Sequence, residues 1–236
     1  PYRGIWVDGG FTTTINNNTM DVEQDGVHAQ NGSFLTINYN IITDFEERGI
    51  NFYSSENSTV NYNRIIGNSW SGGWKQGIGN WDSQQQAIVQ YNYLEVIDST
   101  GNATVCGLEV NGGIIAFDTL LVFSFSGCCD GRSYGIIAHE SIIENNYLNY
   151  VGEDCGCYDN WSAIKSHGSA TNRSSIKSNS IAFQTNGLWN SNILDVSYAD
   201  VEDNDISGTS SDYGPTYVIR DGTENIIRNN TLSGHS

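Results

Sequence analysis

The chain has 236 residues, of which 27 are acidic and 10 are basic, and its formal net charge at pH 7 is −17. This length is sufficient for one domain to bury its own core. The acidic balance argues against nucleic acid or an anionic membrane as a partner, and it disfavours a polyanionic sugar unless a metal ion bridges the two. The sequence has no long apolar run, so no membrane insertion is expected.

One short pattern recurs nine times along the chain. A β-branched residue is followed by two variable residues, an Asn, one variable residue and an aliphatic residue or Met, as in Ile176 to Ile181. Successive Asn positions lie 22 to 33 residues apart, and an aspartate replaces the amide once. The nine positions are Asn18, Asn40, Asn63, Asn92, Asp118, Asn146, Asn179, Asn204 and Asn230.

A period of this size without helical spacing predicts a solenoid in which each turn adds a strand to parallel sheets. We expect the Asn at a sharp turn, because Asn tolerates the left-handed conformation and its amide can bond the backbone or the Asn of the next coil. Asp118 can accept in such a ladder but cannot donate as an amide does. The alternative is an antiparallel sandwich, which would not keep three positions in register through insertions of up to eleven residues.

With this repeat the chain resembles the right-handed parallel β-helix proteins of the pectin-lyase-like superfamily over essentially all of residues 1–236. The resemblance implies an all-β fold, a right-handed parallel β-helix of about nine coils with an Asn ladder, in a single domain. It does not specify a function, because this fold hosts lyases, hydrolases, epimerases, phage tailspikes and structural surface proteins.

A second marker, Gly or Ala followed by an alternating segment, lies upstream of each Asn. The first is Gly4-Ile5-Trp6-Val7, the eighth is Gly187-Leu188-Trp189-Asn190, and a weaker ninth is Tyr217-Val218-Ile219-Arg220. Alternation sends the second residue of each marker inward and the residues one and three positions later outward, including Ile219 and Asp221 in the ninth. Either carbohydrate binding or cross-strand packing explains the aromatic residues on this face. The predicted carbohydrate-binding residues are Trp6, Tyr53, Trp81, Asn111 and Trp189.

Part of this face can carry chemistry. Glu109 and Lys165 fall in one predicted column, roughly 10 Å apart at ~4.8 Å per coil, and His139 and His167 fall in the next column. Proton abstraction beside a uronate carboxylate needs a base, an acid and a group that neutralises charge, and Lys165 with the two His can supply them. Superfamily enzymes commonly place their sites outside this sheet, but no family catalytic motif is present. The alternative is a solvated polar face in which Lys165 offsets Glu109.

No metal site is predicted, because the two His with Asn111 or Glu109 lack a signature spacing. Calcium is the one ion we consider, at the acidic runs 44–47, 153–154 and 200–205, although none has EF-hand spacing and solvated turns explain them equally.

The five cysteines all lie between Cys106 and Cys157. Two of them occupy equivalent positions on successive coils, where Cα atoms lie roughly 5 Å apart, within disulfide range. Such bridges fit an oxidising compartment. The predicted pairs are Cys129 with Cys157 and, second, Cys128 with Cys155 or with Cys106, and one cysteine is left over.

Seven glycosylation sequons also favour secretion, and we expect an extracellular or cell-surface location. The sequence begins without an initiator Met or a signal peptide, so we expect a mature chain or a piece of a longer one. The sequon asparagines are Asn17, Asn31, Asn57, Asn102, Asn160, Asn172 and Asn229.

Two function classes follow from these features. The first is a structural or adhesive module that stacks end to end with copies of itself or with neighbouring domains, burying Ile5, Val7, Ile227 and Leu232. The second is a secreted polysaccharide-degrading enzyme, with a lyase better supplied than a glycosidase. A glycosidase needs a close carboxylate pair, whereas the carboxylates on this face lie several coils apart.

Overall fold

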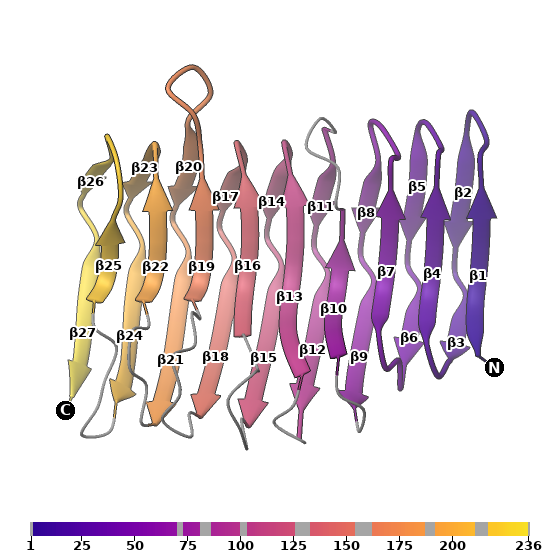
Figure 1. The fold of residues 1–236 in the computed structure, drawn as a ribbon, viewed down its shortest axis with the longest axis horizontal. Coiled ribbons are helices and arrows are strands. Elements are labelled where there is room, and N and C mark those ends of the chain that lie inside the picture. The colour runs from indigo at the N-terminus through magenta and orange to yellow at the C-terminus, as the bar shows by residue number, and fades with distance from the viewer. Residues whose placement is uncertain are drawn as a thin grey trace.

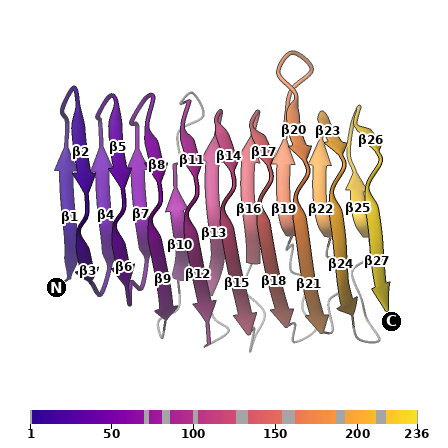
Figure 2. The same ribbon diagram turned by 180° about the vertical axis from the view of Figure 1, so that it is seen from behind.

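The computed structural model describes residues 2–69, 73–80, 86–99, 103–125, 133–153, 162–186, 192–210 and 217–235. These residues form 27 strands and no helix, so nothing in them could cross a membrane as a helix. The strands belong to three sheets of nine, here called A, B and C, and each coil contributes one strand to each sheet (Figures 1 and 2). Neighbouring strands are parallel. The predicted all-β parallel β-helix is confirmed.

The strand bounds follow the repeat. Sheet A contains β1 (Arg3–Asp8), β4 (Asp25–Gln30), β7 (Arg48–Tyr53), β10 (Gly73–Gly79), β13 (Ala103–Asn111), β16 (Ser133–His139), β19 (Ser162–His167), β22 (Asn192–Ser197) and β25 (Tyr217–Asp221). Sheet B contains β2 (Thr13–Asn16), β5 (Leu35–Asn38), β8 (Thr59–Asn61), β11 (Ile88–Gln90), β14 (Ile114–Ala116), β17 (Ile142–Glu144), β20 (Ser174–Lys177), β23 (Ala199–Glu202) and β26 (Ile226–Arg228). Sheet C contains β3 (Thr19–Asp21), β6 (Ile41–Thr43), β9 (Arg64–Ser69), β12 (Tyr93–Asp98), β15 (Thr119–Phe125), β18 (Tyr147–Glu153), β21 (Ser180–Asn186), β24 (Asp205–Ser210) and β27 (Thr231–His235).

The Asn ladder lies at the turn between sheets B and C. Asn40 Nδ2 donates to Asn63 Oδ1 at 3.0 Å and to the Ile15 carbonyl at 2.8 Å, and the backbone N–H of Asn40 donates to the same Oδ1 at 2.9 Å. Equivalent bonds continue to Asn230, where Asn204 Nδ2 donates to Oδ1 at 2.9 Å, except at Asp118, which bonds Asn146 Oδ1 through its backbone N–H alone at 2.9 Å. The ladder predicted from the sequence is confirmed.

The left-handed conformation in each turn is adopted by the residue directly before the ladder position. The prediction that the ladder Asn itself adopts this conformation is therefore wrong. Tyr39, Tyr62, Tyr91 and Phe117 have φ between 56° and 59°. Their exposed rings stack in nearly parallel planes, with centroids 5.0 Å apart, down four coils. This stacking helps to offset the cost of placing aromatic residues in that conformation.

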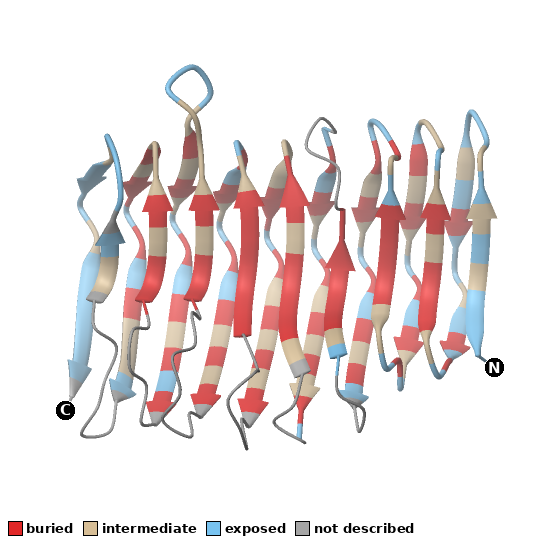
Figure 3. Ribbon diagram, in the orientation of Figure 1, coloured by how far each residue is buried: buried red, intermediate tan, exposed pale blue. Residues whose placement is uncertain are grey.

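The core is one continuous column of hydrophobic side chains, mainly aliphatic, inside the three sheets. Figure 3 shows that the strands of the middle coils are largely buried. In sheet A two consecutive residues of each marker face inward. A Cβ on Gly107 would lie 2.6 Å from the Gly135 carbonyl oxygen and 2.9 Å from Val122 Cγ2, and the next residue, Leu108, is fully buried. The glycine therefore lets the backbone lie close to the core and to the next coil, and the residue before it lies on the outer face.

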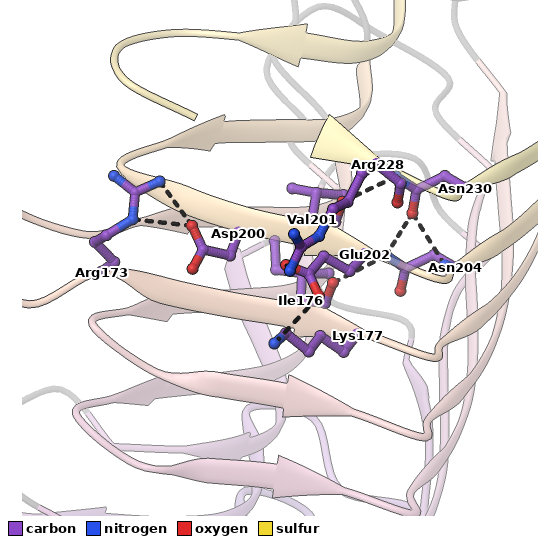
Figure 4. Close-up of polar contacts among 9 residues, drawn as sticks. All are labelled: Arg173, Ile176, Lys177, Asp200, Val201, Glu202, Asn204, Arg228 and Asn230. Atoms are coloured by element: carbon purple, nitrogen blue, oxygen red, sulfur yellow. Dashed lines mark hydrogen bonds and ion pairs between the residues drawn. The ribbon is translucent and has the colours of Figure 1, made fainter. Parts of the chain in front are cut away.

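Charged residues pair across rungs on the outer side of sheet B near the C-terminal coils. Lys177 Nζ lies 3.3 Å from Glu202 Oε2, and Arg228 pairs with the other oxygen of the same carboxylate (Figure 4). These three residues follow one another in register on β20, β23 and β26. The alternating charges therefore link three successive coils.

Candidate functional site: the outer face of sheet A

The outer face of sheet A carries columns of side chains that run along the solenoid axis. In the first seven coils the central column has the register predicted from the sequence. It consists of Trp6, His28, Asn51, Gly79, Glu109, Ile137 and Lys165.

The markers predicted for the last two coils are wrong. The sheet A strand of the eighth coil is β22, where Asp195 is the register partner of Lys165, and Arg220 of β25 follows Asp195. Ile219, which was predicted to face outward, packs against the core instead. The eighth coil has the fully buried Ile193 at the place where the first seven coils have Gly or Ala, so the glycine signal misplaced the strand.

Seven residues form what we call the N-terminal cluster, on the first three coils. Trp6 stacks on His28 with ring centroids 4.2 Å apart and an interplanar angle of 2°, and the Arg3 guanidinium carbon lies 4.6 Å from the Trp6 ring centroid. Trp6 remains 46% exposed. The indole is therefore held in position by two neighbours and still accessible. The cluster consists of Arg3, Trp6, Asp25, His28, Arg48, Asn51 and Tyr53.

Asp25 is the buried carboxyl of this cluster, and sequence reasoning missed it. Its Oδ2 lies 3.4 Å from His28 Nδ1 and 3.6 Å from Arg3 Nε, and the residue is 1% exposed. Burial raises the pKa of the Asp25 carboxyl, and the charges of Arg48 and His28 oppose that shift. Asp25 can therefore hold a proton at a higher pH than an exposed aspartate.

A recess of about 220 Å³ opens beside these residues. Tyr53 lines this recess and is 47% exposed. Asn51 Nδ2 lies 3.2 Å from His28 Nδ1, so these two side chains position each other. The recess thus combines one accessible phenol ring with amide and guanidinium donors. Its lining residues are His28, Gln30, Arg48, Asn51 and Tyr53.

The second cluster, which we call the histidine cluster, contains His139, His167, Lys165 and Asp195. The two imidazole centroids are 5.8 Å apart in an edge-to-face arrangement. Burial lowers the pKa of both His side chains, and the positive charge of Lys165 lowers them further. Both rings are therefore neutral near pH 7 and can accept a proton.

Glu109 lies apart from this cluster. Its Oε2 accepts a hydrogen bond from Gln76 Nε2 at 2.6 Å, and burial raises the pKa of its carboxyl. Ile137 lies in register between Glu109 and Lys165, and Lys165 Nζ lies 5.6 Å from the centroid of the Tyr134 ring. The carboxylate on the rung next to Lys165 is therefore that of Asp195, which sequence reasoning did not identify.

The match to known families is consistent with this geometry. A family described as a right-handed β-helix region matches residues 1–94, which include the whole N-terminal cluster. The chain is a right-handed parallel β-helix repeat protein. No curated protein and no solved structure matches this β-helix significantly.

The structure describes some of the other predicted site residues, and others lie outside its described ranges. Asn111 is the register partner of His139 and is only 8% exposed. Cys106 is a buried thiol that forms no disulfide with another described residue, and its alternative partner, Cys128, lies outside the described ranges. Within the described ranges, no group of three or more His, Cys, Asp or Glu side chains is arranged to hold a metal ion. The predicted residues outside those ranges are Trp81, Asn102, Cys128, Cys129, Cys155, Cys157, Asn160 and Trp189.

Proposed function

We propose that this β-helix is an extracellular structural or adhesive module that binds uncharged polysaccharide on the outer face of sheet A. The observation that carries the proposal is the N-terminal cluster. Its accessible aromatic rings, Trp6 and Tyr53, accompany a recess that is lined by polar hydrogen-bond donors. Aromatic rings can cover the apolar faces of sugar rings, while amide and guanidinium groups bond their hydroxyls.

The direction of the cluster supports a polymer as the ligand. Trp6, His28 and Asn51 follow one another in register across three rungs, so the surface extends roughly 10 Å along the solenoid axis. A sugar chain that lies along this axis would contact a new rung with each step.

The extracellular location is part of the proposal, and the sequon asparagines support it. Every one that falls within the described residues is exposed, as an acceptor of a glycan must be. These residues are Asn17, Asn31, Asn57, Asn172 and Asn229.

Titration calorimetry with a panel of neutral oligosaccharides tests the binding site. Trp6→Ala and Tyr53→Ala should each weaken binding about ten-fold or more, because each removes an accessible aromatic surface. Tyr147→Ala is the matched control, since Tyr147 is 44% exposed on sheet C. Equal effects of all three substitutions, or no binding to any sugar, would exclude the proposed site.

The end coils support the stacking part of the proposal. Ile226, Ile227 and Leu232 are 48%, 42% and 52% exposed, whereas Val201 and Ile206 in the neighbouring coil are fully buried. Figure 3 shows most of β26 and β27 as exposed. Another coil placed on this end would cover them, and we propose that a second copy of the chain supplies it.

A second candidate function, a polysaccharide lyase, is favoured by the histidine cluster. Two neutral imidazoles beside Lys165 supply a proton acceptor and a positive charge for a uronate substrate. If the protein is a lyase, Lys165→Ala and His139→Ala should abolish ultraviolet absorbance from new double bonds while Trp6→Ala leaves part of it. Failure of the unmodified protein to cleave uronate polymers at any pH, with or without calcium, would exclude this activity.

A further inference from the structure

A second and larger recess lies on a different face, at the outer side of sheet B. Its volume is about 760 Å³, which is within the range of small-molecule sites. Its walls come from the connections between sheets A and B, including the loop between β19 and β20 that projects beyond the other turns (Figure 1). Asn57 and Ser58 contribute at one end, and Asn172 and Arg173 at the other.

The floor of this recess is aliphatic. Ile88, Ile114 and Ile142 are register partners on three successive rungs. Ile88 and Ile142 are 40% and 41% exposed although they occupy interior coils. Register partners beyond them are polar, Thr59 on one side and Ser175 on the other. The apolar surface is therefore limited to the floor of the recess.

The recess has one carboxylate that no cation neutralises within the described residues. Glu140 Oε2 accepts a hydrogen bond from Asn172 Nδ2 at 3.0 Å, and hydrogen bonds from Ser169 and Asn172 hold the pKa of Glu140 below its usual range. The nearby Arg173 is already paired, with Nη2 2.7 Å and Nε 2.9 Å from Asp200 Oδ1 (Figure 4). The ionised Glu140 thus gives the recess a negative charge.

We propose that this recess binds an alkylammonium ion, with the ammonium group at Glu140 and the alkyl chain on the isoleucine floor. The charge of the site and the net charge of −17 both favour a cation over an anion. Ile88 and Ile142 are two rungs apart, or roughly 9.6 Å, so an unbranched chain of roughly eight carbons matches the floor.

Glycine shapes the site at its centre. Gly112 has φ of 68° and Gly113 follows it, both at the edge of the floor. A Cβ on Gly113 would overlap the Ala87 carbonyl group, so this position can carry no side chain. The recess is therefore left open directly beside Ile114.

The test compares three probes of equal chain length, octylamine, octanol and octanoate, by calorimetry on the whole chain. The chain is used without glycans, because the sequon asparagines Asn57 and Asn172 line the recess. Octylammonium should bind about five-fold more tightly than octanol, because it adds a partly exposed ion pair, and octanoate should bind most weakly. Added salt should reduce the preference for the cation. Equal affinity for octylammonium and octanoate, or no binding of any probe, would overturn the proposal.

Matched variants distinguish the contribution of the Glu140 charge to binding from that of the isoleucine floor. Glu140→Gln should remove the preference for octylammonium over octanol, whereas Glu144→Gln, which changes the net charge equally outside the recess, should retain it. Ile114→Thr should weaken all three probes, and Ile41→Thr, at an exposed position on sheet C, should weaken none. Circular dichroism confirms the fold of each variant. Identical behaviour within either pair would contradict the assignment.

Discussion

Asp118 Oδ1 accepts two hydrogen bonds from Asn92, one from the backbone N–H at 2.7 Å and one from Nδ2 at 2.9 Å, so a carboxyl fills an amide position in the buried ladder. Its other oxygen, Oδ2, is buried without a hydrogen-bond partner among the described residues. In Asn146 the ladder Nδ2 donates to the Ile115 carbonyl at 3.0 Å. A protonated Asp118 can donate at the equivalent place, whereas an ionised one cannot.

Asp118→Asn should therefore stabilise the protein at pH 7 by about 1–3 kcal/mol, since it restores a buried donor. Burial raises the pKa of Asp118, so its cost is absent below the ordinary aspartate pKa of about 3.9 and grows as pH rises toward the folded-state pKa. Thermal unfolding should show a higher Tm for the variant at pH 7 and a smaller difference near pH 3. An unchanged difference across this range would contradict the assignment.

The ladder amides should also be sensitive to removal. Asn179 Oδ1 accepts from Asn146 Nδ2 at 3.0 Å, and its own Nδ2 donates to the Ile143 carbonyl at 3.0 Å. Asn179→Leu should lower the free energy of unfolding by about 1–3 kcal/mol, because buried partners lose their bonds. Ser180→Ala, at an exposed neighbouring position, should change it by less than about 0.5 kcal/mol in urea titrations.

Gly107→Ala should destabilise the fold by about 1–3 kcal/mol through overpacking, because its Cβ would lie 2.6 Å from a backbone oxygen. Gly32→Ala is the control, since its Cβ would have no neighbour closer than the Gly10 carbonyl oxygen at 3.6 Å. Chemical denaturation of both variants measures the difference. Equal stability of the two would mean that the inward glycine column is dispensable.

Assembly should depend on the aliphatic residues at the end coil. If residues 1–236 stack, light scattering should show a mass that increases with concentration, and Ile227→Lys should abolish the increase. Ile41→Lys is matched in exposure, at 41% against 42%, and should leave the increase intact. A monomer at high concentration for the unmodified chain would refute stacking and favour the lyase.

The sequence was sufficient to predict the repeat, the ladder and most of the central column, because alternation and a fixed register determine which residues share a face. The sequence pattern did not identify Asp25, and the reason is local. Gly26 and Val27 both face the core, which breaks the period of two and turns the preceding residue outward. The signal that could have revealed Asp25 is its place directly before the marker glycine.

The second recess was not predictable either. In the sequence Ile88 and Ile142 resemble any other strand residue, because alternation alone does not indicate an apolar floor. The walls depend on how the connections between sheets A and B lie, for example at Asn172 and Arg173. Connection geometry of this kind is not encoded in a repeat pattern.

The ladder also gives the molecule a polarity. In every bond between two ladder side chains the amide donates to the Oδ1 of the next ladder position on the C-terminal side, from Asn18 to Asn40 and onward to Asn230. Two identical ends placed face to face would oppose like groups, so a two-fold symmetric dimer through the coil ends is unfavourable. Contacts between unlike ends repeat the same donor-to-acceptor order at every junction. Stacking of this chain would therefore produce open, unidirectional filaments instead of closed pairs.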